Sequence, residues 1–583
     1  MRLREQLGVS GALAQVLVRR GLAEPARARA FLAADEEHSP SCFAGIEESV
    51  ALIAGHLRGG SRITVHGDYD VDGICSTAIL VRALRELGAD VDSYLPDRAS
   101  DGYGLSMNTV QRLAARGTRL LITADCGVTA VEEAAAAQAL GMDVVVSDHH
   151  SPRADGVLPK APLVHPALCG YPCPDLCAAG VAYKLAQALF AAVGRNPREL
   201  ERDLDLVALA TIADVVALRG ENRTLVRRGL QALAATSKPG LRALMAVAGV
   251  DRAKLGERAV AFALAPRLKA AGRLYRADAG LELVLTEDRT RAQQIAQELD
   301  SANHERRQVE TRIRYEAEAQ LAEQGERAAY VLAGEDWHAG VIGIVASRMV
   351  ELSGRPVVMV ALDGDTGKGS GRSIAGFDLL AGLTACQSRL LRYGGHRAAG
   401  GLELGRTRLE DFRAAFCEYA ELVLGSGELT KIEHVDAIVA GTDLSMDLAE
   451  ELAGMAPFGQ GNPTVSLMLA DAVFSDSRPM GEGKHVRFSV ESRGAKARAV
   501  AFGNGGRLSV RDGVPVQATF TLEVNEWNGV SEPRLLLRQA AELPAVDLSE
   551  LDSGSQPVEV RVRKIAAARA PREDEDLVLF PVP

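Results

Sequence analysis

Three aspartates and a histidine lie within the eight residues His66–Gly73, directly after the apolar run 62–65. Carboxylates this close together repel one another unless a cation lies between them. Aspartate or histidine also follows three further apolar runs: Asp125 after 120–124, Asp148 to His150 after 144–147, and Asp214 after 206–213. We interpret the four runs as strands of an open α/β sheet, because such sheets place their sites beyond the carboxyl ends of the strands.

These side chains have the chemistry of a centre for two hard divalent cations. Mg²⁺ and Mn²⁺ prefer carboxylate oxygen, and Mn²⁺ also accepts imidazole. Two such cations suit hydrolysis of a phosphodiester, since one activates water and the other stabilises the leaving oxygen. The candidate metal ligands are Asp68, Asp70, Asp72, Asp125, His149 and Asp214. The candidate catalytic residues are Asp70, Asp72, Asp125, His149, His150 and Asp214.

Two histidines near these acids have open roles. His150 either faces the substrate phosphate or orients a neighbour, and His66 is an outer partner beneath the cations. A plainer interpretation treats each aspartate as a turn or helix-capping residue. Four runs that end in the same kind of ligand favour a shared site instead. A structural zinc at Cys169, Cys173 and Cys177 is disfavoured, because no fourth ligand accompanies them at a familiar spacing.

Length and composition define the class of protein. A chain of 583 residues is too long for one hydrophobic core and predicts about three domains. No apolar stretch approaches the length of about 20 residues that a membrane span needs, and the charged amino terminus does not resemble a signal peptide. We therefore expect a cytoplasmic protein. The net charge of −11 alone argues against binding to nucleic acid, so local clusters of Lys and Arg must decide that question.

The sequence pattern divides the chain into six parts. Apolar runs alternate with helical stretches from about 60 to 215, which predicts βαβ units and a parallel sheet. A stretch without Gly or Pro, from 290 to about 324, predicts one long helix that bridges two domains. The expected parts are a helical segment at 1–55, an α/β catalytic domain at 56–288, the long helix at 289–326, a second α/β domain at 327–425, a small β-barrel at 426–545 and a charged tail at 546–583.

Four motifs resemble those of the DHH phosphoesterase superfamily and, within it, the RecJ family of single-stranded-DNA-specific exonucleases. They are HGDYDVDG at 66–73, DCG at 125–127, DHH at 148–150 and TIAD at 211–214. The resemblance extends over residues 60 to about 540. It implies a DHH domain, a linker helix, a DHH-associated domain and an OB-fold barrel. It also implies degradation of single-stranded DNA from 5′ to 3′ to mononucleotides, in recombination and repair.

Glycines and cations gather in the segments 368–373 and 394–401, where backbone amides and Arg side chains suit contact with phosphate. The resemblance places these segments near the scissile phosphate, and residues of the stretches 265–273 and 303–308 against DNA. In the first of these stretches, Leu268-Lys269 departs from the usual Ile-Asn of the family. The candidate DNA-binding residues are Arg267, Arg273, Asn303, Arg306, Arg307, Arg372, Ser373, Gly394, Gly395, His396 and Trp527.

The aromatic residues of the expected barrel divide into two groups. Phe488 and Phe502 lie in alternating strands, so we expect them in the barrel core. Trp527 lies in a turn-like stretch and is the better candidate for stacking on bases. Single-stranded DNA is the expected partner, and a single-strand-binding protein or a helicase is left open as a protein partner.

Two other functions compete with the exonuclease. A phosphodiesterase of short oligonucleotides or cyclic dinucleotides would use the same metal centre, but it would not need the long helix and the carboxy-terminal barrel. A catalytically silent DNA-binding scaffold would have lost metal ligands, whereas every expected ligand position is filled here. The sequence therefore favours a metal-dependent exonuclease.

Overall fold

The computed structural model describes residues 2–96, 104–274, 278–425, 431–527, 529–542 and 558–562. It divides into two compact units. The larger unit consists mainly of His38–Val216 and Arg228–Leu429, and the smaller unit consists of Met1–Glu37, Ala217–Arg227 and Thr430–Val578. Within the described ranges, no helix has the length and apolar character needed to cross a lipid bilayer.

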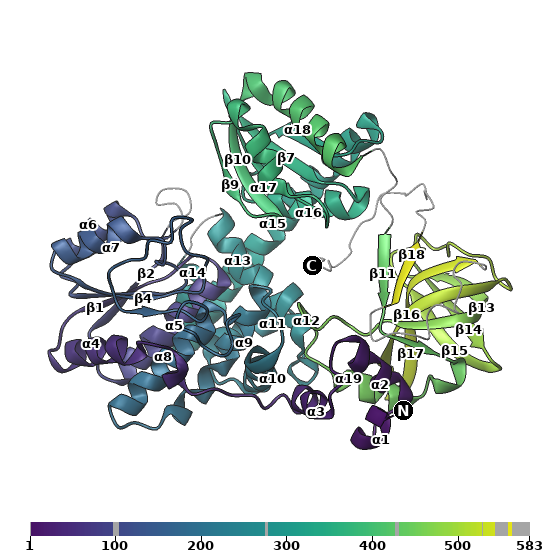
Figure 1. Cartoon of the computed structure of the whole chain (residues 1–583), viewed down its shortest axis with the longest axis horizontal. Coiled ribbons are helices and arrows are strands. Elements are labelled where there is room, and N and C mark those ends of the chain that lie inside the picture. The colour runs from purple at the N-terminus through teal and green to yellow at the C-terminus, as the bar shows by residue number, and fades with distance from the viewer. Residues whose placement is uncertain are drawn as a thin grey trace. The chain divides into compact units, whose positions relative to one another are not determined.

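A parallel sheet forms the centre of the first α/β domain (Figure 1). Its strands are β1 (Ile63–His66), β2 (Val91–Tyr94), β3 (Leu120–Thr123), β4 (Asp143–Ser147) and β5 (Leu163–Val164), in the order β2-β1-β3-β4-β5. Every residue of β1 and β3 is buried, as expected for parallel strands covered on both faces. The strand order reverses direction between β1 and β3, and ligands of open α/β sheets bind beyond the carboxyl ends of the strands at such a point.

Helices cover the faces of this sheet. They are α4 (Ile46–Arg58), α5 (Val71–Glu86), α6 (Met107–Ala115), α7 (Val131–Ala139) and α8 (Ala178–Ala192). The helix α5 starts inside the acidic run, directly after Asp70, and packs against α8, α9 (Leu204–Ala213) and α14 (Ala279–Leu285). Because these neighbours bury nearly all of α5, its first turn is held firmly in place.

The run 206–213 is not a strand, contrary to the prediction. It lies in α9, in which every residue from Leu204 to Thr211 is buried. A short run that is apolar on all sides fits a fully buried helix as well as a central strand, and periodicity does not distinguish the two. Asp214 therefore follows the C-terminus of a helix and still reaches the site from there.

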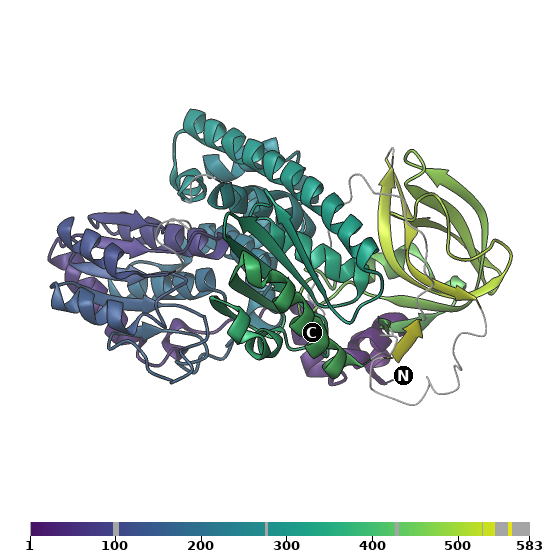
Figure 2. The same cartoon turned by 90° about the horizontal axis from the view of Figure 1, so that it is seen from above.

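One helix connects this domain to the next. It is α15 (Arg289–Gln324), and Figure 2 shows it as a single continuous teal helix. The carboxylate of Asp288 caps its start by accepting hydrogen bonds from the amides of Thr290 and Arg291. The helix contacts α11 (Pro239–Val247), α13 (Ala265–Leu274) and α14, and it also contacts α16 (Ile342–Ser353) and β6 (Tyr330–Glu335) of the second domain. The predicted long helix is thus present with almost the expected bounds.

The second α/β domain is built on a mixed sheet of order β6-β7-β8-β10-β9. The strands are β6 (Tyr330–Glu335), β7 (Val357–Asp363), β8 (Thr366–Arg372), β9 (Arg392–Gly395) and β10 (Ala399–Gly405). One apolar core includes α15 and α16, and a second core includes α17 (Leu379–Ala385) and α18 (Leu409–Leu424). The domain is therefore a three-layer α/β/α structure.

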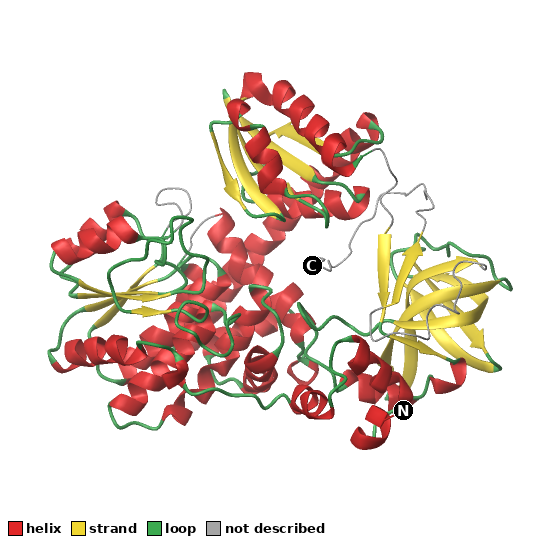
Figure 3. Cartoon of the chain, in the orientation of Figure 1, coloured by secondary structure: helices red, strands yellow, loops and turns green. Residues whose placement is uncertain are grey.

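A closed barrel forms the carboxy-terminal domain, as predicted (Figure 3). Its strands are β13 (Leu467–Met480), β14 (His485–Ser492), β15 (Ala495–Ala501), β16 (Pro515–Trp527) and β17 (Val530–Glu542), and β13 pairs with β16 to close it. Phe488 is buried in the barrel core as expected. Phe502 is not: it follows β15, is 50% exposed and packs its ring edge-on against His485.

The amino-terminal helices pack with the barrel unit. Buried residues of α1 (Arg2–Leu7), α2 (Gly11–Arg19) and α3 (Pro25–Ala33) share its apolar core with α19 (Met446–Ala453). The strand β12 (Ala437–Val439) extends the barrel sheet by pairing with β13. In the expected tail, the described residues form β18 (Val558–Val562), which pairs with β11 (Lys431–Val435).

Candidate metal centre and nucleic-acid contacts

Asp70 is fixed at the start of α5. Its Oδ1 accepts hydrogen bonds from the amides of Asp72 at 2.9 Å and Gly73 at 3.1 Å, so Asp70 is the N-cap of this helix. Burial alone would raise the pKa of Asp70, but the ammonium group of Lys269 and these two amides outweigh it and hold the pKa below its usual value. Asp70 is therefore ionised at neutral pH.

Asp72 is held by the N-terminus of another helix. Its Oδ2 and Oδ1 accept hydrogen bonds of 2.7 Å from the amides of Ala178 and Ala179, at the start of α8. A helix N-terminus favours negative charge, which partly offsets the complete burial of this carboxylate. The pKa of Asp72 nevertheless rises, because burial disfavours its charge. Each oxygen keeps a second lone pair that is available to a cation.

Asp125 follows β3 with a backbone φ of 67°, which is uncommon for a residue other than glycine. Its amide donates to the carbonyl oxygen of Ser147, which ties this turn to β4. Burial and the neighbouring charges of Asp72 and Asp70 raise the pKa of Asp125 well above its usual value. An acid kept in such a position at the end of a central strand is typical of a functional site.

The DHH segment after β4 contains two differently placed histidines. Asp148 Oδ1 accepts hydrogen bonds from the amides of His149 and His150 and lies 2.8 Å from Nδ1 of His150, while its Oδ2 accepts from the amide of Val128. Asp148 therefore orients His150. Burial alone would lower the pKa of His150, but the hydrogen bond and the charge of Asp148 raise it. Burial lowers the pKa of His149, which leaves that imidazole neutral.

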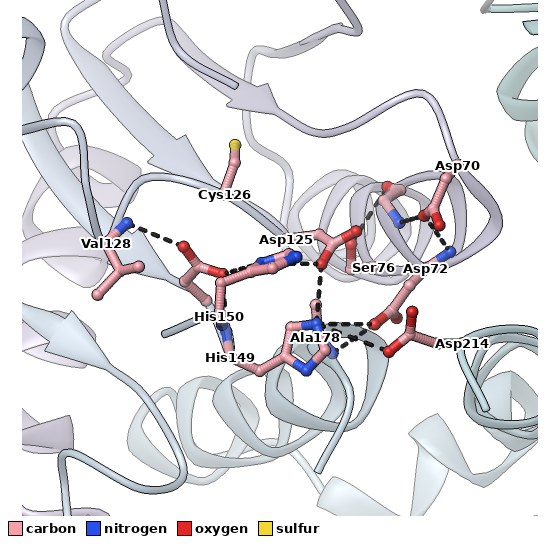
Figure 4. Close-up of polar contacts among 12 residues, drawn as sticks. Asp70, Asp72, Ser76, Asp125, Cys126, Val128, His149, His150, Ala178 and Asp214 are labelled. Atoms are coloured by element: carbon pink, nitrogen blue, oxygen red, sulfur yellow. Dashed lines mark hydrogen bonds and ion pairs between the residues drawn. The ribbon is translucent and has the colours of Figure 1, made fainter. Parts of the chain in front are cut away.

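Three carboxylates surround one nitrogen of His149 (Figure 4). Its Nε2 lies 3.2 Å from Oδ1 of Asp125, 3.7 Å from Oδ2 of Asp72 and 3.8 Å from Oδ2 of Asp214. Burial and repulsion from Asp72 and Asp70 raise the pKa of Asp214 to about 7. The strand β3, the helix α5, the C-terminus of α9 and the DHH segment thus converge on one point.

The donor atoms fit divalent cations. Three overlapping groups each bring their ligand atoms within 4.8 Å of one another: Asp68 with Asp70 and Asp125, Asp72 with His149 and Asp214, and Asp125 with His149 and His150. All six candidate metal ligands belong to these groups. Carboxylate oxygen and neutral imidazole suit Mn²⁺ and Mg²⁺, and thiolate is absent from the set. Burial and, after it, repulsion between carboxylates raise the pKa values of Asp125 and Asp214, and cations at this place would relieve the repulsion.

His66 lies next to this centre without joining the groups of donor atoms. Its ring is buried and stacks on Tyr94 at a centroid distance of 5.5 Å, and its Nδ1 lies 3.5 Å from Sγ of Cys126. Among the described residues, Cys169, Cys173 and Cys177 form no group of donor atoms that could hold a metal.

In the second α/β domain, Arg372 is a half-buried cationic side chain. It ends β8 and donates hydrogen bonds to the carbonyl oxygen of Gly371 and to Oγ of Ser370, and no described carboxylate forms an ion pair with it. Burial lowers its pKa. The neighbouring Ser373 donates its hydroxyl to the carbonyl oxygen of Phe377. Gly394, Gly395 and His396 are exposed at the β9–β10 hairpin.

Three of the other candidate DNA-binding residues form hydrogen bonds within the protein. Arg306 is buried and hydrogen bonds to Asn303 and Glu310 of the same helix, and Asn303 is also buried. Arg307 is exposed. Arg267 donates to Asp300 at 2.8 Å and to the carbonyl oxygen of Ala263. The side chains of Arg273 and Trp527 lie outside the described residues.

Sequence reasoning missed two residues of this centre. Asp148 was seen only as part of a motif, although an aspartate directly before two histidines is well placed to hold one of them. Lys269 was seen only as a departure from a pattern, but its Nζ lies 3.6 Å from Oδ2 of Asp70. No local sequence signal reveals that second contact, because 199 positions separate 70 from 269 along the chain.

Comparison with known families covers most of the chain. Residues 62–211 match the DHH family, N-terminal domain, residues 325–422 match the DHHA1 domain, and residues 435–539 match the RecJ OB domain. The single-stranded-DNA-specific exonuclease RecJ of Bacillus subtilis is 36% identical over 550 residues, which cover 92% of this chain and 69% of that protein. RecJ of Thermus thermophilus is 38% identical, over 88% of this chain and 72% of that protein.

Solved structures give the same result. The crystal structure of RecJ from Thermus thermophilus in complex with Mn²⁺ superimposes with a TM-score of 0.81 at 33% identity, over 94% of this chain and 78% of that one. The structure of the same protein in complex with Mg²⁺ superimposes with a TM-score of 0.75 at 32% identity, over 93% of this chain and 76% of that one. Both ions agree with the donor atoms found here.

Proposed function

The chain belongs to the RecJ family of single-stranded-DNA-specific exonucleases, and we propose that the centre beyond β1, β3 and β4 is where it cleaves the phosphodiester. The protein is a metal-dependent exonuclease of single-stranded DNA. The convergence of Asp72, Asp125 and Asp214 around Nε2 of His149 carries the assignment of the site.

The residues of the centre divide the work between binding cations and binding substrate. Two divalent cations, Mn²⁺ or Mg²⁺, would supply an activated water and neutralise charge on the phosphate oxygens. The residues that would hold them are Asp68, Asp70, Asp72, Asp125, His149 and Asp214. The amides at the start of α5 and α8 hold two of these carboxylates in fixed positions, so little reorganisation is needed during reaction.

His150 acts on the substrate side. Asp148 accepts a hydrogen bond from Nδ1 of His150 and raises the pKa of this imidazole, which favours the doubly protonated form with a proton on Nε2. The side chain is 41% exposed, which allows Nε2 to donate to a phosphate oxygen. Arg372 and the glycines at 394 and 395 would bind phosphates further along the strand, and the barrel would bind the single strand itself. The other proposed DNA contacts are Arg267, Arg273, Asn303, Arg306, Arg307, Ser373, His396 and Trp527.

We also propose the direction and the setting of the reaction. Digestion runs from 5′ to 3′ and releases mononucleotides, in DNA recombination and repair. A helicase or a single-strand-binding protein would supply or present the single strand. We place the action of the enzyme in the cytoplasm.

One assay tests site, direction and substrate together. The full chain is incubated with Mn²⁺ and a single strand labelled at either end, a blunt duplex, or a dinucleotide. We expect early release of the 5′ label as a mononucleotide, slow attack on the duplex and no release by Asp125→Asn. Early release of the 3′ label would show that digestion runs in the opposite direction. Cleavage of the dinucleotide alone would favour a phosphodiesterase of short oligonucleotides. Full activity of Asp125→Asn would contradict the assignment of the site.

A further inference from the structure

Lys269 brings a positive charge to the rim of the metal centre. It lies on α13 between two buried residues, Leu268 and Ala270. Its Nζ donates a hydrogen bond of 3.1 Å to the carbonyl oxygen of Ala213 and lies 3.6 Å from Oδ2 of Asp70. The side chain is 27% exposed, so the ammonium group remains within reach of a ligand that enters from solvent.

The ammonium group and Asp70 are each held in place without the other. Ala213 is the last residue of α9, where carbonyl groups lack partners within the helix and positive charge is favoured. Asp70 is held by the amides of Asp72 and Gly73. Since the backbone positions both groups independently, Lys269 contributes charge to the centre and is not needed to place a ligand.

A charge balance gives this lysine a role. Five carboxylates belong to the groups of donor atoms, namely Asp68, Asp70, Asp72, Asp125 and Asp214, whereas Asp148 is paired with His150. Two divalent cations neutralise four of these five charges, so one negative charge remains to repel the phosphodiester that must enter. The ammonium group of Lys269 carries the one positive charge that cancels this remainder.

We propose that Lys269 is a fixed positive charge of the metal centre, which weakens the binding of divalent cations and strengthens the binding of the DNA phosphate. The proposal rests on the proposed function, because the phosphate concerned is that of the strand being cleaved. The proposal also predicts that loss of this charge strengthens the binding of Mn²⁺ and weakens the binding of the single strand. A residue that merely held Asp70 in place would change both in the same, unfavourable direction.

The test compares Lys269→Met, which keeps the length of the side chain without its charge, with Lys269→Arg, which keeps the charge. Lys160→Met is the matched control, because Lys160 is an exposed lysine outside the centre. Mn²⁺ binding to the full chain is measured without DNA, from the electron paramagnetic resonance signal of free Mn²⁺. The KM for a single strand is measured separately at saturating Mn²⁺.

For Lys269→Met we expect about threefold to tenfold tighter Mn²⁺ binding and a KM for the single strand that rises by a similar factor. Lys269→Arg should lie closer to the wild type in both quantities, and Lys160→Met should match the wild type. Weaker or unchanged Mn²⁺ binding in Lys269→Met, or the same changes in Lys269→Arg, would overturn the proposal. If Lys269→Met does not fold, Lys269→Gln takes its place.

Failure of the proposed function would be recognised separately. It would appear as a wild-type protein that releases no nucleotide from single strands. The comparison of Mn²⁺ binding between the wild type and the lysine variants does not depend on that activity, so it still decides whether the charge of Lys269 acts on the centre.

Discussion

At the scale of single residues, Asp148 separates the two histidines of the DHH segment into different roles. Both of its carboxylate oxygens accept hydrogen bonds from groups of the protein, and Oδ1 lies 2.8 Å from Nδ1 of His150. The result is an imidazole with a raised pKa, His150, beside one with a lowered pKa, His149, whose Nε2 faces three carboxylates. The proposed metal ligand His149 and the proposed proton donor His150 therefore lie next to each other in the chain.

Replacement of Asp148 tests whether the two histidines have different roles. In Asp148→Asn the carboxylate that raises the pKa of His150 is lost, so the imidazole gives up its proton at lower pH. We expect activity on single strands to fall about tenfold to a hundredfold, and its decline toward alkaline pH to begin at lower pH than in the wild type. A pH–rate profile measures both. An unshifted profile would show that the proton of His150 is not used.

The raised pKa of Asp214 makes stability depend on pH and metal. The folded protein holds this proton up to about pH 7, whereas the unfolded chain releases it at the ordinary value of 3.8. The proton therefore favours the folded state at low pH, and this contribution, on the order of 4 kcal/mol, is lost as pH rises from about 4 through 7. Mn²⁺ must displace the proton, so stabilisation by Mn²⁺ grows over the same range.

Thermal melts with and without Mn²⁺, between about pH 5 and 8, check this expectation. Asp214→Asn is the control, because an amide has no proton to lose there. The melting temperature of the metal-free wild type should fall relative to that of Asp214→Asn as pH rises. A difference between the two proteins that does not change with pH would contradict the assigned pKa.

At the scale of elements, the start of α5 depends on a close approach of backbones. A Cβ atom on Gly73 would lie 2.4 Å from the carbonyl oxygen of Asp68. Gly73→Ala should therefore force apart the turn that carries Asp68 and Asp70. We expect the free energy of unfolding to fall by about 2 kcal/mol and the binding of Mn²⁺ to weaken. Denaturant unfolding and Mn²⁺ titration measure the two effects.

Gly55 provides the matched control. It lies in α4 of the same unit, its backbone is not left-handed, and no atom lies within 4 Å of the position of its Cβ. Gly55→Ala should raise stability by about 0.5–1 kcal/mol, because alanine restricts the unfolded chain and favours helix. If the two alanine variants behaved alike, the close approach at Gly73 would not matter.

The elements also show what the sequence could predict. Strands β1, β3 and β4, the long α15 and the barrel were predictable, because local periodicity and turn residues define them. The helix α9 was not, because a run that is apolar on all sides fits either element. The burial of Arg306 and the approach of Lys269 to Asp70 depend on contacts between distant residues, which local patterns do not contain.

At the scale of the whole molecule, a chain with a net charge of −11 must bind a polyanion. Overall attraction cannot supply this binding, because the excess of acids repels DNA at long range. Part of that excess lies in the metal centre, where bound cations would neutralise it. Binding of DNA must therefore depend on a limited number of Lys and Arg side chains. Each of them should contribute measurably to the salt dependence of DNA binding.

Arg372 is the cationic side chain whose contribution is easiest to isolate, since no described carboxylate forms an ion pair with it, and its contact with a phosphate would release a counterion. In Arg372→Gln we expect weaker binding to single strands, and a plot of log K against log salt whose slope is smaller by about 0.7. Arg408 of the same domain already pairs with Asp411, so Arg408→Gln should leave the slope unchanged. Fluorescence anisotropy of a labelled strand gives both slopes. Equal slopes for the wild type and Arg372→Gln would place Arg372 outside the DNA path, and the other proposed contacts would then have to hold the strand.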